Sequence, residues 1–368
     1  MAGQRRPDRV LSQDQRLRWA WTQEGRNLRL AYRGGVVQWT LPEAMVEHPP
    51  SQDLLRVATY ALLSPWYDDV LDGWTPQRRA GSKVGLAFSG GIDSTAAMLL
   101  LPEDTALVHH RRTFQSILKH EGADRLFDVL RKTSGRDILS VPSDHEQIRA
   151  HWGRPRGFST DLASAVHLIL MADFLDLRGI AFGMPIDNTY LWHGHRWRDF
   201  SSSSWWRRHA PVMSSVGLDI VLPIGGISQA STVRLVQEAG LGDVVSSCLR
   251  APFPGCGRCW KCFHKHTLLG READFEAREI QTFLAKRPLK TATHVLWWIH
   301  EHDRWDLIPD LAHLKDHDLS AWTMHYAPAF ELLPDWIRDH VQQTVERSIP
   351  RMPDDAALIG QDLFPDAP

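Results

Sequence analysis

The chain has 368 residues, a formal net charge of -2 and 43% hydrophobic residues, values typical of a globular protein with a large core. The near-neutral charge argues against a broadly basic nucleic-acid-binding surface. No apolar run reaches the roughly 20 residues of a membrane helix, and the basic start lacks the apolar stretch of a secretory signal. We therefore expect a cytoplasmic protein with no membrane partner and no strong nucleic-acid signal.

The first segment, residues 1–82, has the period of antiparallel strands. Over residues 16–41 apolar and polar residues alternate, and glycine-containing turns interrupt the alternation. This pattern predicts a small β meander. A helix is predicted over about residues 53–71, and a polar linker at 78–83 precedes a change of pattern.

From residue 83 to residue 266 strands and helices are predicted to alternate. The predicted strands are 84–88, 106–109, 138–141, 180–183 and 220–223, and the predicted helices are 95–101, 114–132, 161–177 and 232–238. Repeated βα units form a parallel sheet with helices on both faces, so we predict an α/β fold. The connection at 184–218 shows no such pattern and is predicted to be a long loop.

The last segment, residues 267–368, is predicted to be helical and rich in tryptophan, with a loosely attached tail over its last twenty residues. Most of the 16 tryptophans lie in the two flanks, 1–82 and 267–368, and in one central loop. One interpretation of the flanks is extra packing or oligomerisation, with a homodimer or partner proteins bound through them. The alternative is a platform for a larger substrate.

The sequence FSGGIDST, residues 88–95, lies between a predicted strand and a predicted helix. Its two glycines would let the backbone approach a phosphate, and the first helical turn would favour an anion through its free N–H groups and dipole. The two serines could add hydroxyl donors, and Asp93 could hold the Mg²⁺ of ATP or orient the loop. A serine-capped turn without a ligand is the plainer interpretation. The spacing and the missing lysine exclude a Walker A loop.

The four cysteines, Cys248, Cys256, Cys259 and Cys262, form two overlapping C-x-x-C pairs with one thiol upstream. In a reducing compartment, clustered thiols are more often metal ligands than disulfides. Four thiolates complete the tetrahedral shell of a structural Zn²⁺ ion, so the segment 248–262 predicts a zinc site. An iron–sulfur cluster is an alternative, although its fourth cysteine usually lies downstream and precedes proline. Free or redox-active thiols are a third interpretation.

Residues 89–94, Ser-Gly-Gly-Ile-Asp-Ser, resemble the signature of the N-type ATP pyrophosphatases, the PP-loop family. The resemblance implies a Rossmann-like, adenine-nucleotide α-hydrolase-like fold that binds ATP and Mg²⁺ and releases AMP. The implied catalytic residues are Asp93 and Ser94. The implied ATP-binding residues are Ser89, Gly90, Gly91, Ile92, Asp93, Ser94 and Thr95, to which we add His109 because the end of its strand would face the nucleotide.

A second stretch narrows the resemblance. A proline-bearing strand at 220–223, a helix beginning at Ser228, and the pair Ser247-Cys248 before the remaining cysteines are similar to the C-terminal half of 7-cyano-7-deazaguanine synthases. That family activates a carboxylate as its adenylate, and ammonia then attacks to give an amide or a nitrile. We therefore expect a carboxylate substrate, small or borne by a macromolecule, in an anti-phage or natural-product context.

The substrate region departs from the family pattern. Gln229 stands where the family has lysine, and Thr160 and Asp161 are the best matches to its Arg-Asn pair. Asp187 and Tyr190 are what remains of the family's substrate-contacting stretch. The resemblance implies that Thr160, Asp161, Asp187 and Tyr190 bind substrate. Two alternatives stay open, a PP-loop tRNA-modifying enzyme and a non-catalytic nucleotide-binding scaffold.

Overall fold

A computed structural model of the protein describes residues 9–14, 19–116, 118–192, 196–289, 292–354 and 362–364. Its described strands form one nine-stranded sheet, ordered β1-β2-β3-β4-β7-β6-β5-β8-β11, and one two-stranded ribbon. The sheet strands are β1 (Arg9–Asp14), β2 (Trp19–Glu24), β3 (Asn27–Tyr32), β4 (Gly35–Thr40), β5 (Lys83–Ala87), β6 (Ala106–Arg112), β7 (Ile138–Ser143), β8 (Leu177–Ala181) and β11 (Asp219–Val221). The ribbon pairs β9 (Leu191–Trp192) with β10 (Arg196–Trp197).

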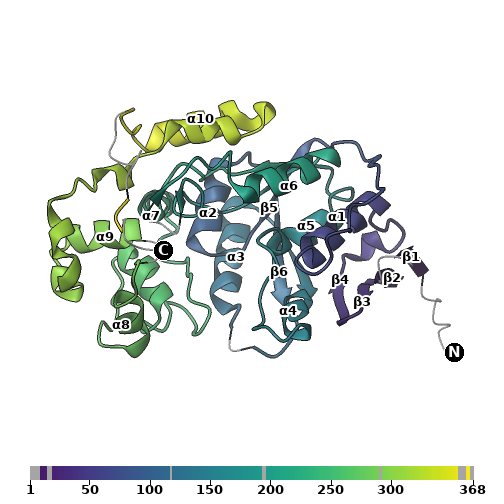
Figure 1. Ribbon diagram of the computed structural model, residues 1–368, viewed down its shortest axis with the longest axis horizontal. Helices are drawn as coiled ribbons and strands as arrows, with labels where there is room; N and C mark the ends of the chain where they lie inside the picture. Colours follow the sequence, from purple (N-terminus) through teal and green to yellow (C-terminus); the bar gives the residue numbers. More distant parts are fainter. Residues whose placement is uncertain are drawn as a thin grey trace.

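The helices surround the large sheet (Figure 1). They are α1 (Gln52–Leu63), α2 (Ile92–Leu100), α3 (Glu121–Ser134), α4 (Ile148–His151), α5 (Val166–Leu170), α6 (Ser204–Ser215), α7 (Gln229–Glu238), α8 (Arg278–Leu284), α9 (Ala292–Glu301) and α10 (Asp335–Ser348). Short 3₁₀ turns and one π-helical turn, Cys262–His266, connect them. Among the described residues, no helix combines the length and the hydropathy needed to cross a membrane.

The strands β7, β6, β5, β8 and β11 are parallel neighbours. β5 is the first of them in the chain and lies at their centre. The chain then fills the β6 side as far as β7 and returns to the other side of β5 for β8 and β11. In sheets of this order, ligands bind at the carboxyl ends of the strands, where the direction of winding changes.

Two hydrophobic cores cover the two faces of this parallel half. Leu86 and Leu107 belong to the core under α2, α3 and α7. Val108 and Ile180 belong to the core that α1 and α5 share with the meander. Successive strand residues point to opposite faces of a sheet, and both sets lie in cores that helices cover, so helices cover both faces. The predicted α/β fold is therefore confirmed, with a mixed rather than a wholly parallel sheet.

The predicted meander is confirmed for β2, β3 and β4, which pair antiparallel in chain order. It is joined to the parallel strands, because β4 pairs with β7 through Trp39 and Ser143. Residues 16–18 of the predicted meander lie outside the described residues. The helix predicted over 53–71 ends at Leu63, since Pro65 has no backbone N–H to continue it.

Three other predictions were wrong in their boundaries or type. The helix predicted at 161–177 is a 3₁₀ turn and the short α5, and the positive φ of 53° at Asp176 ends the turn before β8. An all-apolar run looks alike in a buried helix and a buried strand. The helix predicted at 114–132 begins only at Glu121. The loop predicted at 184–218 contains α6, which Ser203 caps by accepting a hydrogen bond from the Trp206 N–H.

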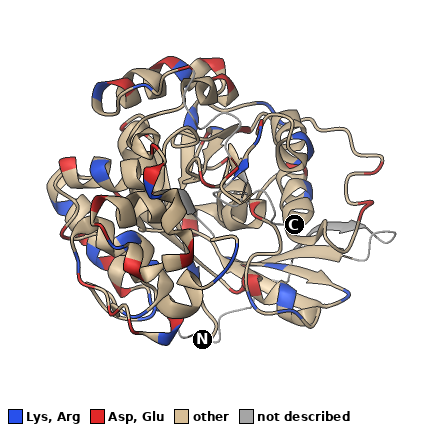
Figure 2. Ribbon diagram, turned by 60° about the vertical axis from the view of Figure 1, so that its left-hand side comes forward, with Lys and Arg blue, Asp and Glu red and all other residues tan. Residues whose placement is uncertain are grey.

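The C-terminal region packs on the sheet rather than standing apart. Helix α10 lies beside α2, and its buried Ile337, Val341 and Val345 complete the core under α2 (Figure 1). Where the predicted tail is described, it contacts the rest of the chain: Met352 is 4% exposed, and the Asp362 carboxylate is 2.8 Å from the Arg196 guanidinium. Basic and acidic residues are interspersed over the described helices and loops in the view of Figure 2.

The meander is attached to α1 by a buried hydrogen bond that mutation can test. The indole N–H of Trp21 donates to the hydroxyl of Thr59 at 2.8 Å, and both side chains are fully buried. Thr59→Val leaves the indole N–H without an acceptor, and we expect the free energy of unfolding to fall by about 1–3 kcal/mol. Urea unfolding followed by tryptophan fluorescence measures the loss. The matched variant Thr133→Val, on the exposed side of α3, should change stability by less than about 0.5 kcal/mol. Equal losses would contradict the assignment.

Candidate functional site

The glycine-rich loop predicted to bind phosphate joins β5 to α2. Gly90 has a φ of +75°, and a Cβ atom there would lie 2.7 Å from that of Ala123, so the position requires glycine. Gly91 caps α2, and its carbonyl accepts hydrogen bonds from the hydroxyls of Ser94 and Thr95 at 3.0 and 2.8 Å. These bonds hold the first turn of α2, the end of a helix that favours an anion.

The loop opens onto a cleft of about 530 Å³ at the carboxyl ends of β5, β6 and β8. We define two walls of the cleft by residues that line it. The loop wall consists of Ser89, Gly91, Ile92, Asp93, Ser94, Ser247, Lys261 and Lys265. The histidine wall consists of His109, His110, His120, Phe158, Asp161, Ser164 and His167. Most of the predicted nucleotide-binding residues therefore meet in one cleft.

A second cavity, of about 720 Å³, lies at the opposite edge of the sheet, before β6 and β7. Its lining includes Thr105, Arg136 and Leu241, and none of the predicted site residues is part of the described lining. The smaller cleft is the better candidate site, because there a glycine loop meets a cluster of titratable side chains.

The loop wall contains a charge pair that sequence reasoning missed. The Lys265 ammonium forms an ion pair with Asp93 in the first turn of α2, and the other oxygen of Asp93 is 3.4 Å from the Thr232 hydroxyl. Lys265 is 8% exposed, and Lys261 lines the same wall. Both lysines lie near Cys262 in the sequence. Residues 247–266, which we call the cysteine segment, therefore supply cations to the loop in addition to the thiols of the cluster. Only the contact between two distant segments reveals this.

His109 lies in the cleft, but both of its ring nitrogens are occupied. The backbone N–H of Arg112 donates to Nε2 of His120, Nδ1 of His120 then donates to Nε2 of His109, and Nδ1 of His109 donates to the Phe88 carbonyl. Burial lowers the pKa of His109 to about 4, so the ring is neutral at pH 7. His109 therefore holds the end of β6 to the end of β5, and only its ring carbons are available to a ligand.

Of the four predicted substrate-binding residues, only Asp161 lines the cleft. Its neighbour Thr160 is turned away, and its hydroxyl donates to the Ala61 carbonyl of α1 at 2.7 Å. Thr160 thus attaches the histidine wall to α1, a contact that depends on tertiary packing and has no signal in the local sequence.

The other two predicted substrate-binding residues are buried beside the cleft. Asp187 accepts a hydrogen bond from the backbone N–H of Gln229 at 3.3 Å, and its other oxygen is 3.5 Å from Nδ1 of His294. Tyr190 packs edge-on against Tyr326 with ring centroids 5.0 Å apart. Asp187 joins the loop after β8 to the start of α7 and to α9, and Tyr190 joins the same loop to Tyr326 in the C-terminal region. Neither residue is part of the cleft lining.

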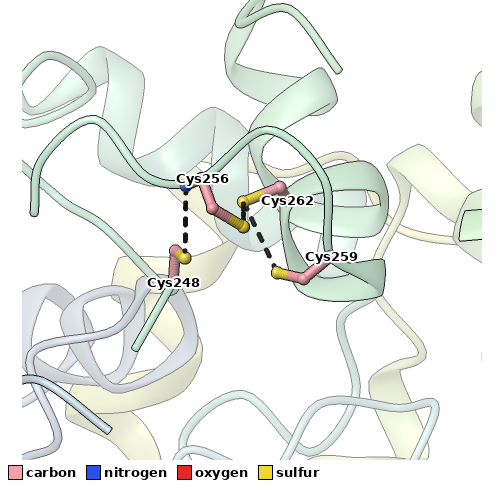
Figure 3. A group of neighbouring side chains, drawn as sticks. All are labelled: Cys248, Cys256, Cys259 and Cys262. Carbon is pink, nitrogen blue, oxygen red and sulfur yellow. Dashed lines mark hydrogen bonds between the residues drawn. The ribbon is translucent and has the colours of Figure 1, made fainter. Parts of the chain in front are cut away.

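The four cysteines converge on one point (Figure 3). The Cys262 sulfur is 3.7 Å from that of Cys256 and 3.6 Å from that of Cys259, and all four sulfurs lie within 4.8 Å of one another. Zinc–sulfur bonds of about 2.3 Å place the sulfurs of a regular tetrahedron about 3.8 Å apart. The described cluster therefore fits one zinc ion. A polynuclear iron–sulfur cluster would hold the sulfurs farther apart.

The cysteine segment contacts the phosphate loop directly. The backbone N–H of Ile92, at the start of α2, donates to the hydroxyl of Ser247 at 3.2 Å, and the Ser247 N–H donates to Nε2 of His266 at 3.1 Å. Gly255 is required for this packing, because a Cβ atom there would lie 2.8 Å from the His266 ring. The cysteine cluster and the first turn of α2 are thus parts of one assembly.

Comparison with known families gives one partial match. Residues 208–359 match a family of unknown function, DUF6395. This segment includes the four cysteines and both lysines of the loop wall, but it excludes the glycine loop and the histidine wall. No curated protein matches the chain.

Removing one of the four thiols should prevent the cysteine cluster from holding a zinc ion. In Cys259→Ser we expect bound zinc to fall from about one per chain to a small fraction, with a lower unfolding midpoint, because metal-binding energy is also folding energy. Elemental mass spectrometry measures the zinc, and a visible absorption band would reveal iron instead. The variant Ser215→Ala, on α6, should keep the metal. A Cys259→Ser protein that is metal-free and as stable as the wild type would contradict the structural role.

Stability should fall on mild acidification. Burial lowers the pKa of His109 to about 4 and those of His145 and His167 to about 3, from an ordinary value of 6.5. Below pH 6.5 the unfolded chain binds protons that the folded protein excludes, so the free energy of unfolding is retained above pH 6.5 and is lost as the pH falls towards 4. The slope is up to about 1.4 kcal/mol per pH unit for each histidine.

Urea unfolding between about pH 7.5 and pH 5.5 measures this slope. His145→Phe keeps an aromatic ring beside Trp39 and removes one such titrating group, so its pH dependence should be shallower by about one proton. The exposed replacement His317→Phe serves as the control and should leave the slope unchanged. Parallel slopes in all three proteins would rule out the buried-histidine explanation.

Proposed function

We propose that the protein is an ATP-dependent, AMP-forming enzyme that activates a carboxylate as its adenylate and passes the acyl group to ammonia or another amine. The observation that carries the proposal is the loop wall. There a glycine loop, the first turn of α2 and two lysines line one cleft at the switch point of a parallel sheet. Backbone N–H groups, hydroxyls and ammonium groups together make a site for a polyphosphate.

The charges of the loop wall support the binding of a polyphosphate that can compete with a carboxylate for a lysine. Lys265 is paired with Asp93 in the free protein, and a triphosphate would compete with this carboxylate for the ammonium group. Asp93 would then be released to bind the Mg²⁺ that accompanies ATP. Gln229 stands where the resembled family has lysine, and Lys261 and Lys265 supply cations at this cleft instead.

The chemistry needs little beyond alignment and charge stabilisation. A carboxylate oxygen of the substrate attacks the α-phosphorus of ATP, and the bond to the β-phosphate oxygen breaks, so pyrophosphate leaves beside the loop wall. Ammonia then attacks the acyl carbon, and AMP leaves with the former carboxylate oxygen to give an amide. A nitrile would require a second activation of the amide oxygen and its loss with AMP.

Zinc in the cysteine shell would be structural, since four thiolates leave no open coordination position. Its role in this proposal is to hold Ser247, Lys261 and Lys265 against the loop, in a cytoplasm that keeps the thiols reduced. The strand order and the loop together support a PP-loop, adenine-nucleotide α-hydrolase-like assignment of the fold. The interspersed charges favour this enzyme over a tRNA-modifying relative, which needs a basic surface (Figure 2).

The test separates nucleotide binding from catalysis. Calorimetry with ATP and Mg²⁺ should show binding by the wild type, and Lys265→Met should weaken it about tenfold to a hundredfold because a charged hydrogen-bond donor is lost. Lys132→Met, which removes an exposed lysine at the end of α3, should bind as the wild type does. An absence of ATP uptake by the wild type would refute the proposal.

Catalysis is measured as AMP release from ATP, Mg²⁺, ammonia and 7-carboxy-7-deazaguanine, with other acids in parallel. Asp93→Asn should retain its fold and lose AMP formation by about a hundredfold or more, because the charge that positions Lys265 and the metal is removed. A protein that binds ATP yet releases no AMP with any acid would point to the nucleotide-binding scaffold instead.

A further inference from the structure

One cation of the cleft lies outside the loop wall. Arg112 is the last residue of β6, and it lines the cleft together with Lys261 and Lys265. The pairing of β6 with β7 fixes its backbone, and its backbone N–H donates to the His120 ring. Its side chain is only 14% exposed, so a charged group is held largely away from bulk water. The polyphosphate site at the loop wall does not use this charge.

Glu146 holds the inner edge of the Arg112 guanidinium. The Nε atom of Arg112 is 2.6 Å from one carboxylate oxygen of Glu146, and the same oxygen is 3.6 Å from Nδ1 of His110, which also lines the cleft. The contact is an ion pair without a hydrogen bond, because neither Nε nor this oxygen has a hydrogen-bond partner among the described residues. Glu146 therefore balances the charge of Arg112 and leaves its N–H donors unused.

The outer edge of the same guanidinium is accessible. A guanidinium has five N–H donors, and none of those of Arg112 has an acceptor in the part of the chain that the structure describes. Nε is buried, whereas the two terminal nitrogens are not. Burial and the charges of Arg111 and Arg112 lower the pKa of His120, so the guanidinium lies within electrostatic range of the histidine wall. Since Arg112 lines the cleft, its accessible edge is available to a ligand there.

Other arginines show that the fold can saturate such a group. Arg78, whose side chain is 5% exposed, donates to three backbone carbonyls and to the Asp173 carboxylate. Arg111 donates to both carboxylate oxygens of Asp124, at 2.8 and 2.9 Å. Charged donors without acceptors destabilise a folded protein. The unused donors of Arg112 are therefore better explained by a ligand than by a structural role.

We infer that Arg112 is a second oxyanion-binding site of the cleft, where its two terminal nitrogens hold an oxyanion apart from the polyphosphate at the loop wall. The identity of the bound molecules rests on the proposed function. The expected oxyanion is the carboxylate of the acid substrate, because a guanidinium fork matches a carboxylate. Asp161 lines the same cleft, so an incoming carboxylate needs a cation beside it. The α-phosphate of the nucleotide is the other source of the same chemistry.

Nitrogen NMR of protein labelled with nitrogen-15 in its arginine side chains observes the guanidinium directly. The Arg112 signals are assigned by their loss in Arg112→Lys. The additions are acetate, which represents the carboxylate of an unidentified acid, acetamide, which has the same shape and no charge, and ATP with Mg²⁺. Arg131, an exposed arginine of α3 that pairs with Asp128, reports non-specific binding in the same sample.

We expect acetate to move the Arg112 signals saturably, with or without ATP, while acetamide leaves them in place and the Arg131 signals do not respond. This result assigns the site to the acid. A shift with ATP and Mg²⁺ that abolishes the response to acetate assigns it to the α-phosphate. Signals that neither anion moves, or that acetate moves no more than those of Arg131, overturn the inference.

The backbone amide of Gly91 reports ATP uptake at the loop wall separately. If this amide responds to ATP while Arg112 responds to neither anion, the proposed function stands without this inference. If acetate moves the Arg112 signals while Gly91 does not respond to ATP, the oxyanion site stands and the proposed function fails.

The affinity for acetate, taken from the line width of its carbon-13 signal, provides a second measurement. Arg112→Met should weaken binding about tenfold or more, the effect of a charged bidentate contact. Arg112→Lys should weaken it less, because lysine keeps the charge and loses the fork.

The matched control removes the same charge from the neighbouring residue. In Arg111→Met the lost guanidinium was already occupied by Asp124, so we expect the affinity for acetate to change by less than about twofold. Equal losses in Arg111→Met and Arg112→Met would contradict a direct contact. If Arg112→Met does not fold because Glu146 loses its counter-ion, Arg112→Lys and the NMR measurement on the wild type decide.

Discussion

The contact between the cysteine segment and the start of α2 is the constraint on which the candidate site depends. Ser247 accepts the Ile92 N–H and donates its own N–H to His266, while Lys265 pairs with Asp93. These bonds join two segments more than a hundred residues apart at the place where a helix end favours an anion. A change in the cysteine cluster therefore reaches the loop through two contacts, Ser247 with Ile92 and Lys265 with Asp93.

The flanking regions contribute to the same cleft through packing. The Trp39 ring of the meander stacks on His145, with ring centroids 5.5 Å apart, and His145 stacks in turn on Phe158 of the histidine wall. On the C-terminal side, His294 of α9 approaches Asp187 after β8. The two flanks, 1–82 and 267–368, thus pack against residues that line the cleft or lie beside it. In a close-packed interior, a shift of either flank would displace these residues.

Much of the fold could be predicted because its signals are local. Alternating residues predicted β2 to β4, and short apolar runs predicted β5 and β6. The prediction of one long helix over residues 161–177 was wrong because an all-apolar segment has no period that separates a buried helix from a buried strand. Helix α6 was missed although Ser203 marks its start, because Pro211 and the surrounding polar residues are typical of a loop.

The sequence by itself determined the glycine loop before α2 and the spacing of the four cysteines, since both sites are built from residues close together in the chain. Only the tertiary structure decided that Lys265 faces Asp93, that Asp187 and Tyr190 are buried beside the cleft, and that both ring nitrogens of His109 are occupied. The physical reason is that ion pairing, burial and hydrogen-bond saturation depend on which distant segments meet. No period or motif within one segment carries that information.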